Sequence, residues 1–466
     1  MPIQLVFLWS DLLIWALLGA AGLFAWLSRR NPPLRQAWAR VGASPVGMAA
    51  ATLLLAFVLV GLLDSLHFRQ RLPDQGDKPV YAVEVLSGLD ALAGGLRQRN
   101  ERTYSAPLAT HSFAREMLDL PDGRQSRAYP RLKFGGAHLG TETGDWGGDV
   151  AARCGRGLLL GLGLWALLAA TLTLLLARRQ ACSLASMGRR IAAGRAGLAW
   201  RAVLLTLALL LALLGPMLCL AQGYHVLGTD KVGQDVLYQV LKSIRTALVI
   251  GLVTTLVTLP LGIFLGIIAG YFRGWVDDLI QYIYTVLNSI PGVLLIAAAV
   301  LMMQVIIDTH PQWFATAAER ADLRLLALCF ILGLTSWTGL ARLLRGETLK
   351  LRELEYIQAA QAFGVSHARI ILRHLLPNLM HIVIIALVMD FSGLVLAEAV
   401  LSYVGIGVDP TMISFGTMIN SARLELGREP VVWWSLLAAF VFMFVLVLAA
   451  NLFADCVRDA FDPRAG

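Results

Sequence analysis

The chain has 466 residues, of which 57% are hydrophobic and only 15% are charged. Soluble globular proteins carry roughly 25% charged residues, so this composition excludes a soluble enzyme, a secreted disulfide scaffold, a collagen-like fibre and a disordered tail. The net charge of +8 reflects arginines beside apolar runs, which is typical of a membrane topology signal and not of a nucleic-acid-binding face. The five cysteines are dispersed without Cys-x-x-Cys spacing, so we expect neither a disulfide framework nor a zinc site.

Nine apolar stretches are long enough to cross a bilayer, whose hydrocarbon core of about 30 Å takes roughly 20 helical residues. They are residues 4–27, 46–66, 156–177, 202–221, 244–270, 279–305, 324–343, 379–400 and 431–454. The first stretch lacks the basic start of a signal peptide and is followed directly by Arg29 and Arg30. We therefore expect it to remain as a span, with the N-terminus outside. The predicted fold class is an all-α integral membrane protein with about nine transmembrane helices.

The basic loops predict the orientation of these spans. Loops 28–45 and 178–201 contain arginines and no acidic residue, and loop 342–378 has six basic residues against three glutamates. All three loops fall on one side, which the positive-inside rule makes cytoplasmic, and the C-terminus falls there too. The opposite side carries residues 67–155, which are mixed in charge and rich in glycine. They predict a small extracytoplasmic domain or a semi-ordered lobe.

One stretch of the 342–378 loop predicts two helices joined by a sharp turn. Four residues lie at the i, i+3, i+4 and i+7 spacing of one helix face, namely Tyr356, Ala359, Ala360 and Phe363. Gly364 suits the left-handed position after a helix end, Ser366 can cap a second helix, and Pro377 would stop or bend that helix. The first helix could dock in a groove of a cytosolic partner or rest on lipid, and the pattern leaves both open.

A second informative segment, 225–237, lies between two spans. Asp230 and Asp235 can cap helix starts there, and Gly228 and Gly233 allow tight turns. A calcium loop is the alternative interpretation. Such loops need acidic ligands at alternating positions, which this segment lacks, so capping is favoured.

Charged residues and glycines inside the spans are the remaining candidates for a role in a transport path or in helix packing. Asp390 and Glu398 belong to the 379–400 stretch and are eight residues apart. They could face a water-filled path, or make structural hydrogen bonds between helices, which we favour. In the 244–270 stretch, glycines recur at small-xxx-small spacing near Pro260 and predict close helix packing, with a hinge as the alternative. These glycines are Gly251, Gly262, Gly266 and Gly270.

The chain lacks the common motifs of ATP binding and hydrolysis. No Gly-x-x-x-x-Gly-Lys-Ser/Thr, His-Glu-x-x-His or Gly-x-Ser-x-Gly sequence occurs, so we expect no phosphate-cradling loop and no hydrolase site. If ATP drives this protein, another subunit must hydrolyse it.

The 355–377 segment resembles the EAA loop of ABC importer permeases. That loop has Glu-Ala-Ala, three residues, Gly, and nine further residues before a hydrophobic-x-Leu-Pro sequence. The matching residues are Ala359, Ala360, Gly364, Leu376 and Pro377. Gln358 replaces the glutamate, and His374 stands where isoleucine is usual.

Further segments resemble the dipeptide/oligopeptide/nickel class of these permeases. Residues 225–237 are similar to its extracytoplasmic signature, with Val226 in place of proline and Gln234 in place of arginine. Residues 337–346 are similar to the entry into its EAA loop, and residues 401–408 and 458–464 complete the pattern. The resemblance covers about residues 201–466. Residues 1–200, with three spans and the 67–155 lobe, would be an N-terminal extension.

The resemblance implies a non-catalytic permease subunit with six core helices in residues 201–466, in a multi-pass bacterial inner membrane protein. It implies a second, homologous permease in a heterodimer, two cytosolic ABC ATPases, an extracytoplasmic solute-binding protein and a peptide substrate, with no nucleic acid. ATP and Mg²⁺ would be bound by the ATPases, and no cofactor or metal by this chain. The implied ATPase-coupling residues are Glu355, Tyr356, Gln358, Ala359, Ala360, Phe363, Gly364, His374 and Pro377. The implied extracytoplasmic motif is Gly228, Thr229, Asp230, Gly233 and Asp235.

The sequence is also compatible with other functions. The substrate could be nickel or another small solute. An ion-coupled secondary transporter would use Asp390 and Glu398, but such folds typically carry inverted repeats, and we find none. A membrane-anchored signalling or scaffold protein would use residues 67–155 to sense a ligand.

Overall fold

The computed structural model describes residues 3–72, 81–119, 125–140, 145–314, 316–409 and 411–461. The helices are α1 (Trp9–Arg30), α2 (Pro32–Ala43), α3 (Pro45–Asp64), α4 (Gly88–Leu92), α5 (Gly94–Gln98), α6 (Trp146–Arg179), α7 (Leu184–Ala192), α8 (Trp200–Ala221), α9 (Val236–Phe272), α10 (Gly274–Ser289), α11 (Gly292–Thr309), α12 (Ala317–Arg352), α13 (Glu355–Ala362), α14 (His367–Ile370), α15 (Leu376–Val404), α16 (Phe415–Glu425) and α17 (Trp434–Phe461). A 3-10 turn spans Pro311–Trp313, and a π-helical turn, Ile371–Leu375, joins α14 to α15.

The strands are short and form two small sheets. They are β1 (Ile3–Val6), β2 (His67–Gln70), β3 (Leu86–Ser87), β4 (Glu116–Asp119) and β5 (Gln125–Ala128). β2 pairs antiparallel with both β1 and β3, and β4 pairs antiparallel with β5. The chain is therefore an all-α membrane protein with minor strand elements.

Within the described ranges, nine helices are long and apolar enough to cross a membrane, which agrees with the predicted number. Two predicted boundaries are wrong. Residues 4–27 do not form one helix, because Ile3–Val6 pairs with His67–Gln70 as a strand before α1 begins at Trp9. Residues 279–305 are also divided, since Ile290 is extended before Pro291, and α10 ends there. Proline restricts the residue before it to extended conformations, so only α11 remains as the candidate span in this region.

The described residues form two compact units. The first is drawn from Met1–Val6, Trp38–Thr246 and Ile413–Phe453, and the second from Phe7–Ala37, Ala247–Met412 and Ala454–Gly466. The predicted division between residues 200 and 201 marks where the family resemblance begins. The two compact units do not test it, so it stays a prediction.

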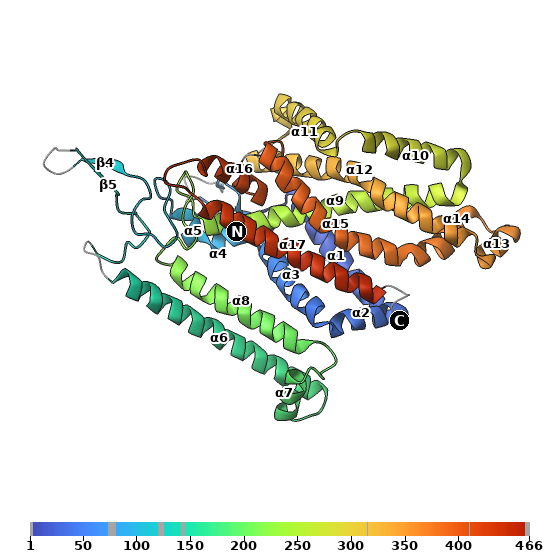
Figure 1. Ribbon diagram of the computed structural model, residues 1–466, viewed down its shortest axis with the longest axis horizontal. Helices are drawn as coiled ribbons and strands as arrows, with labels where there is room; N and C mark the ends of the chain where they lie inside the picture. Colours follow the sequence, from blue (N-terminus) through green and yellow to red (C-terminus); the bar gives the residue numbers. More distant parts are fainter. Residues whose placement is uncertain are drawn as a thin grey trace. The chain divides into compact units, whose positions relative to one another are not determined.

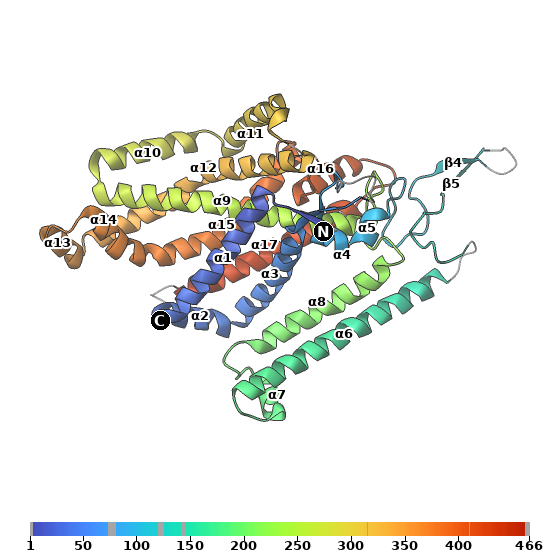
Figure 2. The same cartoon turned by 180° about the vertical axis from the view of Figure 1, so that it is seen from behind.

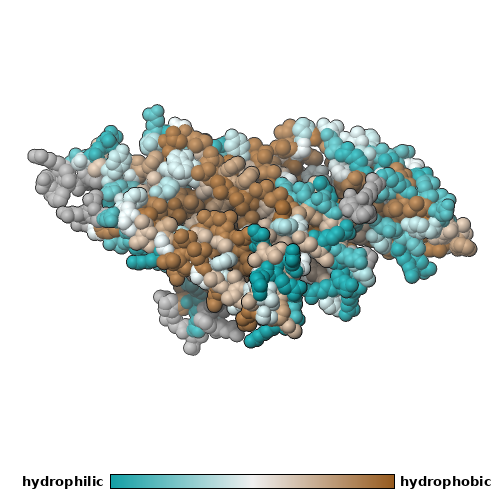
Figure 3. All heavy atoms as spheres, turned by 60° about the horizontal axis from the view of Figure 1, so that its bottom comes forward, coloured by the Kyte–Doolittle hydropathy of each residue, from teal (hydrophilic) through white to brown (hydrophobic). Residues whose placement is uncertain are grey.

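In the first unit, α6 and α8 form a closely packed antiparallel hairpin, which Figures 1 and 2 show side by side. Gly157 and Gly161 of α6 lie directly against the α8 backbone at Gly215 and Leu211. Small residues let the backbones approach this closely. The outward leucines of the pair are exposed, for example Leu159 (74%) and Leu209 (62%), and Figure 3 shows broad hydrophobic areas on the face that it draws.

Gly161→Leu should therefore separate α6 from α8. A Cβ at this position would meet the carbonyl oxygen of Leu211, which is backbone and cannot give way without moving the helix. We expect a loss of about 1–3 kcal/mol in the free energy of unfolding, measured by thermal unfolding in detergent. Gly163→Leu is the matched control, because a Cβ there meets nothing within 4 Å. Equal stability of the two variants would contradict the packing.

In the second unit, the glycines of α9 serve the predicted packing role. Gly262, Gly266 and Gly270 lie against α12 at Leu340, Ala341 and Thr348. Gly251 faces the ring of Phe391 in α15. α9 continues as one helix through Pro260. A buried cluster around Tyr271, Leu344 and Ile357 then joins the end of α9 to α12, α13 and α15.

Candidate functional site

The predicted helix in the 342–378 loop exists as α13 and lies between α12 and the long helical segment His367–Val404. α12 continues to Arg352, and α14 begins at His367, so little of this loop is irregular. Figures 1 and 2 both show α13 at the end of α12 and α14. A displacement of α13 would thus act directly on helices that belong to candidate spans.

Gly364 ends α13 as its residue type predicts. Its φ is +72°, and its N–H donates to Gln361 O at 3.0 Å while Val365 N donates to Ala360 O at 3.1 Å. This pair of bonds is the Schellman arrangement, which requires a left-handed residue after the helix. The prediction for Gly364 is confirmed at the level of backbone conformation.

The sequence did not reveal which residue of α13 is buried. Ile357 is completely buried and belongs to the core cluster of this chain, with Ala360 partly buried beside it. Tyr356 (45% exposed), Ala359 and Phe363 (87% exposed) lie on the surface. The predicted face is therefore mostly the outward face, and it is available to a partner.

Tyr271, at the end of α9, holds α13 and α14 together and was missed by sequence reasoning. Its hydroxyl lies 2.8 Å from His367 Nδ1 and accepts a bond from Gln361 Nε2 at 3.4 Å. Its carbonyl oxygen accepts from the Arg352 guanidinium at 2.6 Å. Tyr271 is 3% exposed. Only its position after a long apolar stretch could have drawn attention to it.

Tyr356 and His374 also contact one another across the turn. Their ring centroids are 6.1 Å apart, and Asn378 Nδ2 donates to the Tyr356 hydroxyl at 3.1 Å. Gln358 remains exposed and donates to Glu353 O at 3.2 Å, while Glu355 is exposed in the first turn.

The second helix differs from its prediction in two respects. Ser366 occupies the N-cap position, but its side chain makes no capping hydrogen bond. Pro377 does not stop the helix, because a π-helical turn at Ile371–Leu375 precedes it and the chain continues into α15; the alternative, a bend at Pro377, stays a prediction. Such turns accommodate the missing N–H of proline.

The extracytoplasmic motif of residues 225–237 is largely buried. His225, Thr229 and Asp235 are each at most 2% exposed. Asp235 Oδ1 caps α9 by accepting from Leu237 N at 2.8 Å, as predicted. Asp230 differs, because Oδ1 accepts from Val232 N and Gln234 N, which closes a turn and not a helix start. Gly228 and Gly233 have φ of +74° and +77°, as their predicted turns require.

Residues 101–105 of the predicted lobe contact this motif. Thr229 Oγ1 accepts from Ser105 N at 2.7 Å and donates to Thr103 O at 2.9 Å. Gly233 lies directly against the backbone of Glu101. The Trp434 indole donates to Thr229 O at 3.0 Å. The motif thus anchors the insert to the start of α9, and its buried residues do not face solvent.

Glu101 is the central residue of this anchor, and no sequence motif indicates its role. Its carboxylate accepts from Lys133 N, Phe134 N and Gly135 N at 2.7–3.1 Å. His225 lies between Glu101 and Asp235, with Nε2 3.4 Å from Glu101 and Nδ1 2.8 Å from Asp235. Burial acts to lower the pKa of His225, but the hydrogen bonds to Asp235 and Glu101 outweigh it and raise that pKa to about 9.

The pH dependence of stability follows from these two groups. His225 titrates near 6.5 when unfolded and near 9 when folded, so its stabilisation is complete below about pH 6.5 and is lost as the pH rises to about 9. Burial acts to raise the pKa of Glu101, yet its hydrogen bonds lower it from 4.5 to about 2. That stabilisation is complete above about pH 4.5 and is lost as the pH falls to about 2.

The contribution of Glu101 and His225 to the stability of the lobe is therefore largest between about pH 4.5 and 6.5. We expect a loss of roughly 3 kcal/mol between pH 6.5 and 9, measured by thermal unfolding of the full chain at each pH. The same loss in His225→Gln, which carries no titrating imidazole, would contradict the assignment to His225.

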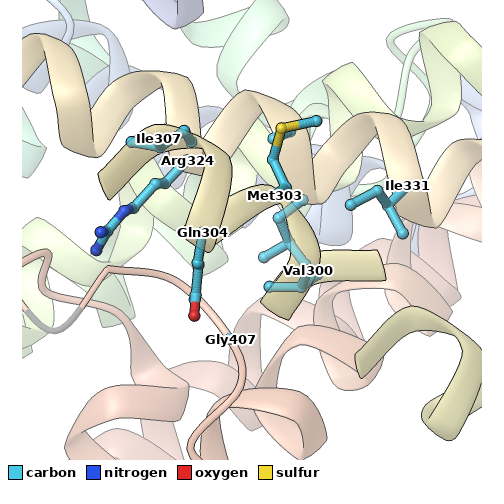
Figure 4. A pocket seen from close by; sticks show the side chains of 9 residues that line it. Val300, Met303, Gln304, Ile307, Arg324, Ile331 and Gly407 are labelled. Atoms are coloured by element: carbon cyan, nitrogen blue, oxygen red, sulfur yellow. The ribbon is translucent and has the colours of Figure 1, made fainter. Parts of the chain in front are cut away.

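Asp390 and Glu398 differ in their surroundings. Asp390 is partly exposed, whereas Glu398 is 2% exposed and accepts a bond from Ser402 Oγ at 2.6 Å within α15. A pocket lies between α11, α12 and the loop at Gly407, and Figure 4 shows Gln304 pointing toward that loop. At this pocket, Arg324 bonds Asp409 Oδ2 at 2.5 Å and pairs with Asp308. A role of Asp390 and Glu398 in a path stays a prediction.

The described ranges contain no cluster of side chains suited to a metal ion. No group of three or more His, Cys, Asp or Glu side chains lies close enough there to hold a metal ion.

Comparisons with known proteins agree with the resemblance of the sequence motifs. Residues 262–466 match the family described as binding-protein-dependent transport system inner membrane component. The chain is 32% identical over 241 residues to the oligopeptide transport system permease protein OppC of Mycobacterium tuberculosis, covering 52% of this chain and 76% of that protein. It is 31% identical to the dipeptide transport system permease protein DppC of Lactococcus lactis, covering 52% of this chain and 64% of that protein. It is 33% identical to the glutathione transport system permease protein GsiD of Pectobacterium atrosepticum, covering 52% and 73%.

Proposed function

This chain belongs to the family of binding-protein-dependent transport system inner membrane components, and we propose that it is the permease subunit of an ABC importer for peptides. The relatives are named for oligopeptides, dipeptides and glutathione, all of which contain peptide bonds. This shared chemistry favours a peptide over nickel or another small solute.

The observation that carries the proposal is the construction of α13. Its buried side, Ile357, is fixed in the core of this chain, while Phe363 and Tyr356 project outward. An exposed aromatic face on an anchored helix suits docking into a groove of a partner. The partner in this proposal is a cytosolic ATPase, whose closure would move α13 together with α12 and α14. If α13 instead rested on lipid, its exposed rings would be explained. The contacts of Ile357 and Tyr271 would then have no role in passing movement from α13 to the spans.

The proposed assembly contains two such ATPases, an extracytoplasmic binding protein and a second, homologous permease. This chain would be a multi-pass inner membrane subunit without catalytic activity, and ATP and Mg²⁺ would bind to the ATPases. Its basic loops support a cytoplasmic location for α13 and the C-terminus. The pairing of β1 with β2 supports an N-terminus on the same side as the 67–155 lobe. We further propose that this lobe covers the extracytoplasmic mouth or contacts the binding protein.

Uptake into proteoliposomes that contain the chain with its partner permease, ATPases and binding protein tests this function. We expect accumulation of a labelled di- or oligopeptide that requires ATP and persists when the proton gradient is dissipated. Uptake that needs the gradient and not ATP would instead indicate a secondary transporter. Binding of ligand by the lobe without any uptake would indicate a signalling protein.

Phe363→Ala should weaken binding of the ATPases without destabilising this chain. Phe363 is 87% exposed, so its loss costs little packing here, whereas an aromatic anchor in an interface contributes about 2 kcal/mol or more. We expect at least roughly thirtyfold weaker ATPase association, measured with purified subunits. Trp313→Ala is the matched control, because Trp313 is 58% exposed and precedes the opposite end of α12. Equal weakening by both variants would argue against docking at α13.

A further inference from the structure

The turn between α6 and α8 carries a dense group of arginines. All of them are exposed, and they are Arg178, Arg179, Arg189, Arg190, Arg195 and Arg201. The sequence contains no Asp or Glu between residues 150 and 229. In the described part of the chain, none of these arginines forms an ion pair. We name this group the basic turn.

Packing of α7 directs the basic turn outward. Met187 (0% exposed) and Ile191 (5%) bury one side of α7 in a cluster with Ala177, and Trp200 packs against it. Arg190 NH1 donates to Gln180 Oε1 at 3.1 Å, which holds α7 at the end of α6. The arginines therefore occupy one surface and have no anionic partner within this unit.

The length of α6 places the basic turn at a membrane border. Arg156 and Arg178 are exposed and lie 22 residues apart on one helix, which corresponds to about 33 Å at the α-helical rise. This separation matches a hydrocarbon core of about 30 Å. Leu184 (52% exposed) and Leu198 (38%) project beside the arginines. Apolar side chains next to a basic surface suit the boundary between headgroups and acyl chains.

We propose that the basic turn is a binding site for the phosphate of anionic phospholipid headgroups. The guanidinium group presents a planar fork of donors that matches a phosphate. Basic clusters directly beside a membrane helix attract anionic lipids, and the absence of nearby acids leaves this attraction uncompensated. This role is separate from transport, because neither α13 nor the 225–237 motif takes part in it.

Lipid binding to the purified full chain in neutral detergent tests the site. Native mass spectrometry would count bound phosphatidylglycerol and phosphatidylcholine at equal concentrations, with inorganic phosphate added as a competitor. We compare wild type with a variant combining R178Q, R179Q, R189Q and R190Q, and with the same four positions changed to Lys. Arg156→Gln is the matched control at the other end of α6. Monodisperse elution and helical circular dichroism check the fold of each variant.

Wild type should bind phosphatidylglycerol at least about tenfold more tightly than phosphatidylcholine, and added salt should weaken this binding. The Gln variant should lose the preference, and Arg156→Gln should retain it in full. The Lys variant should retain a weaker preference, because it keeps the positive charge without the planar fork. Equal binding of both lipids by wild type, an unchanged preference in the Gln variant, or displacement by millimolar inorganic phosphate would overturn the proposal. If the Gln variant does not fold, a salt-independent preference in wild type and the Lys variant would overturn it.

Discussion

Gly364→Val is expected to reduce substrate-stimulated ATP hydrolysis by at least about tenfold in the reconstituted complex. Gly364 has φ of +72° at the end of α13, and an L residue in this region costs about 1–2 kcal/mol, with β-branched residues the least suited to it. The exit from α13 would have to change, and with it the orientation of the exposed face relative to α14. The measurement is ATPase activity with saturating binding protein and peptide.

Gly364→Asn distinguishes the effect of the left-handed backbone conformation from the effect of adding a side chain. Asparagine tolerates the left-handed region, and a Cβ at this position meets nothing within 4 Å of this chain. We therefore expect Gly364→Asn to retain most of the stimulation. Full activity of Gly364→Val would contradict the proposed coupling. Equal loss in both variants would show that a side chain at this position clashes with a partner.

Glu101→Gln is expected to detach the lobe from the start of α9. An amide has one acceptor oxygen, so it cannot satisfy the three backbone N–H groups at Lys133, Phe134 and Gly135 that the carboxylate now accepts. The neutral side chain also leaves His225 with one carboxylate partner in a buried site. We expect a loss of roughly 3 kcal/mol in unfolding free energy at pH 6, together with faster proteolysis between residues 101 and 119.

Glu84→Gln provides the control for this change. Glu84 also belongs to the lobe and pairs with Arg97, but its side chain is 66% exposed. Exposed ion pairs contribute little to stability, so this variant should behave as wild type. A Glu101→Gln protein with unchanged stability and unchanged cleavage would show that the lobe is held by other contacts.

Local chemistry allowed several features to be predicted from the sequence. Spans are set by apolar length, and the reversal at Gly364 and the cap at Asp235 depend on residues within one turn of the chain. The division of residues 279–305 was also readable in principle, because Ile290 precedes Pro291. The strand at Ile3–Val6 was not, since its apolar residues merge with the following helix and its partner lies at His67–Gln70.

The sequence by itself determined the membrane class, the number of spans, the family resemblance and the helix–turn that ends at Gly364. Tertiary structure alone decided which side of α13 is buried, because the spacing of Tyr356 and Phe363 predicts a face without saying whether Ile357 or that face meets the core. It also decided the roles of Tyr271 and Glu101. Tyr271 contacts His367, 96 residues away in the chain, and Glu101 contacts His225, 124 residues away. Bonds of that range arise only when packing brings distant segments together.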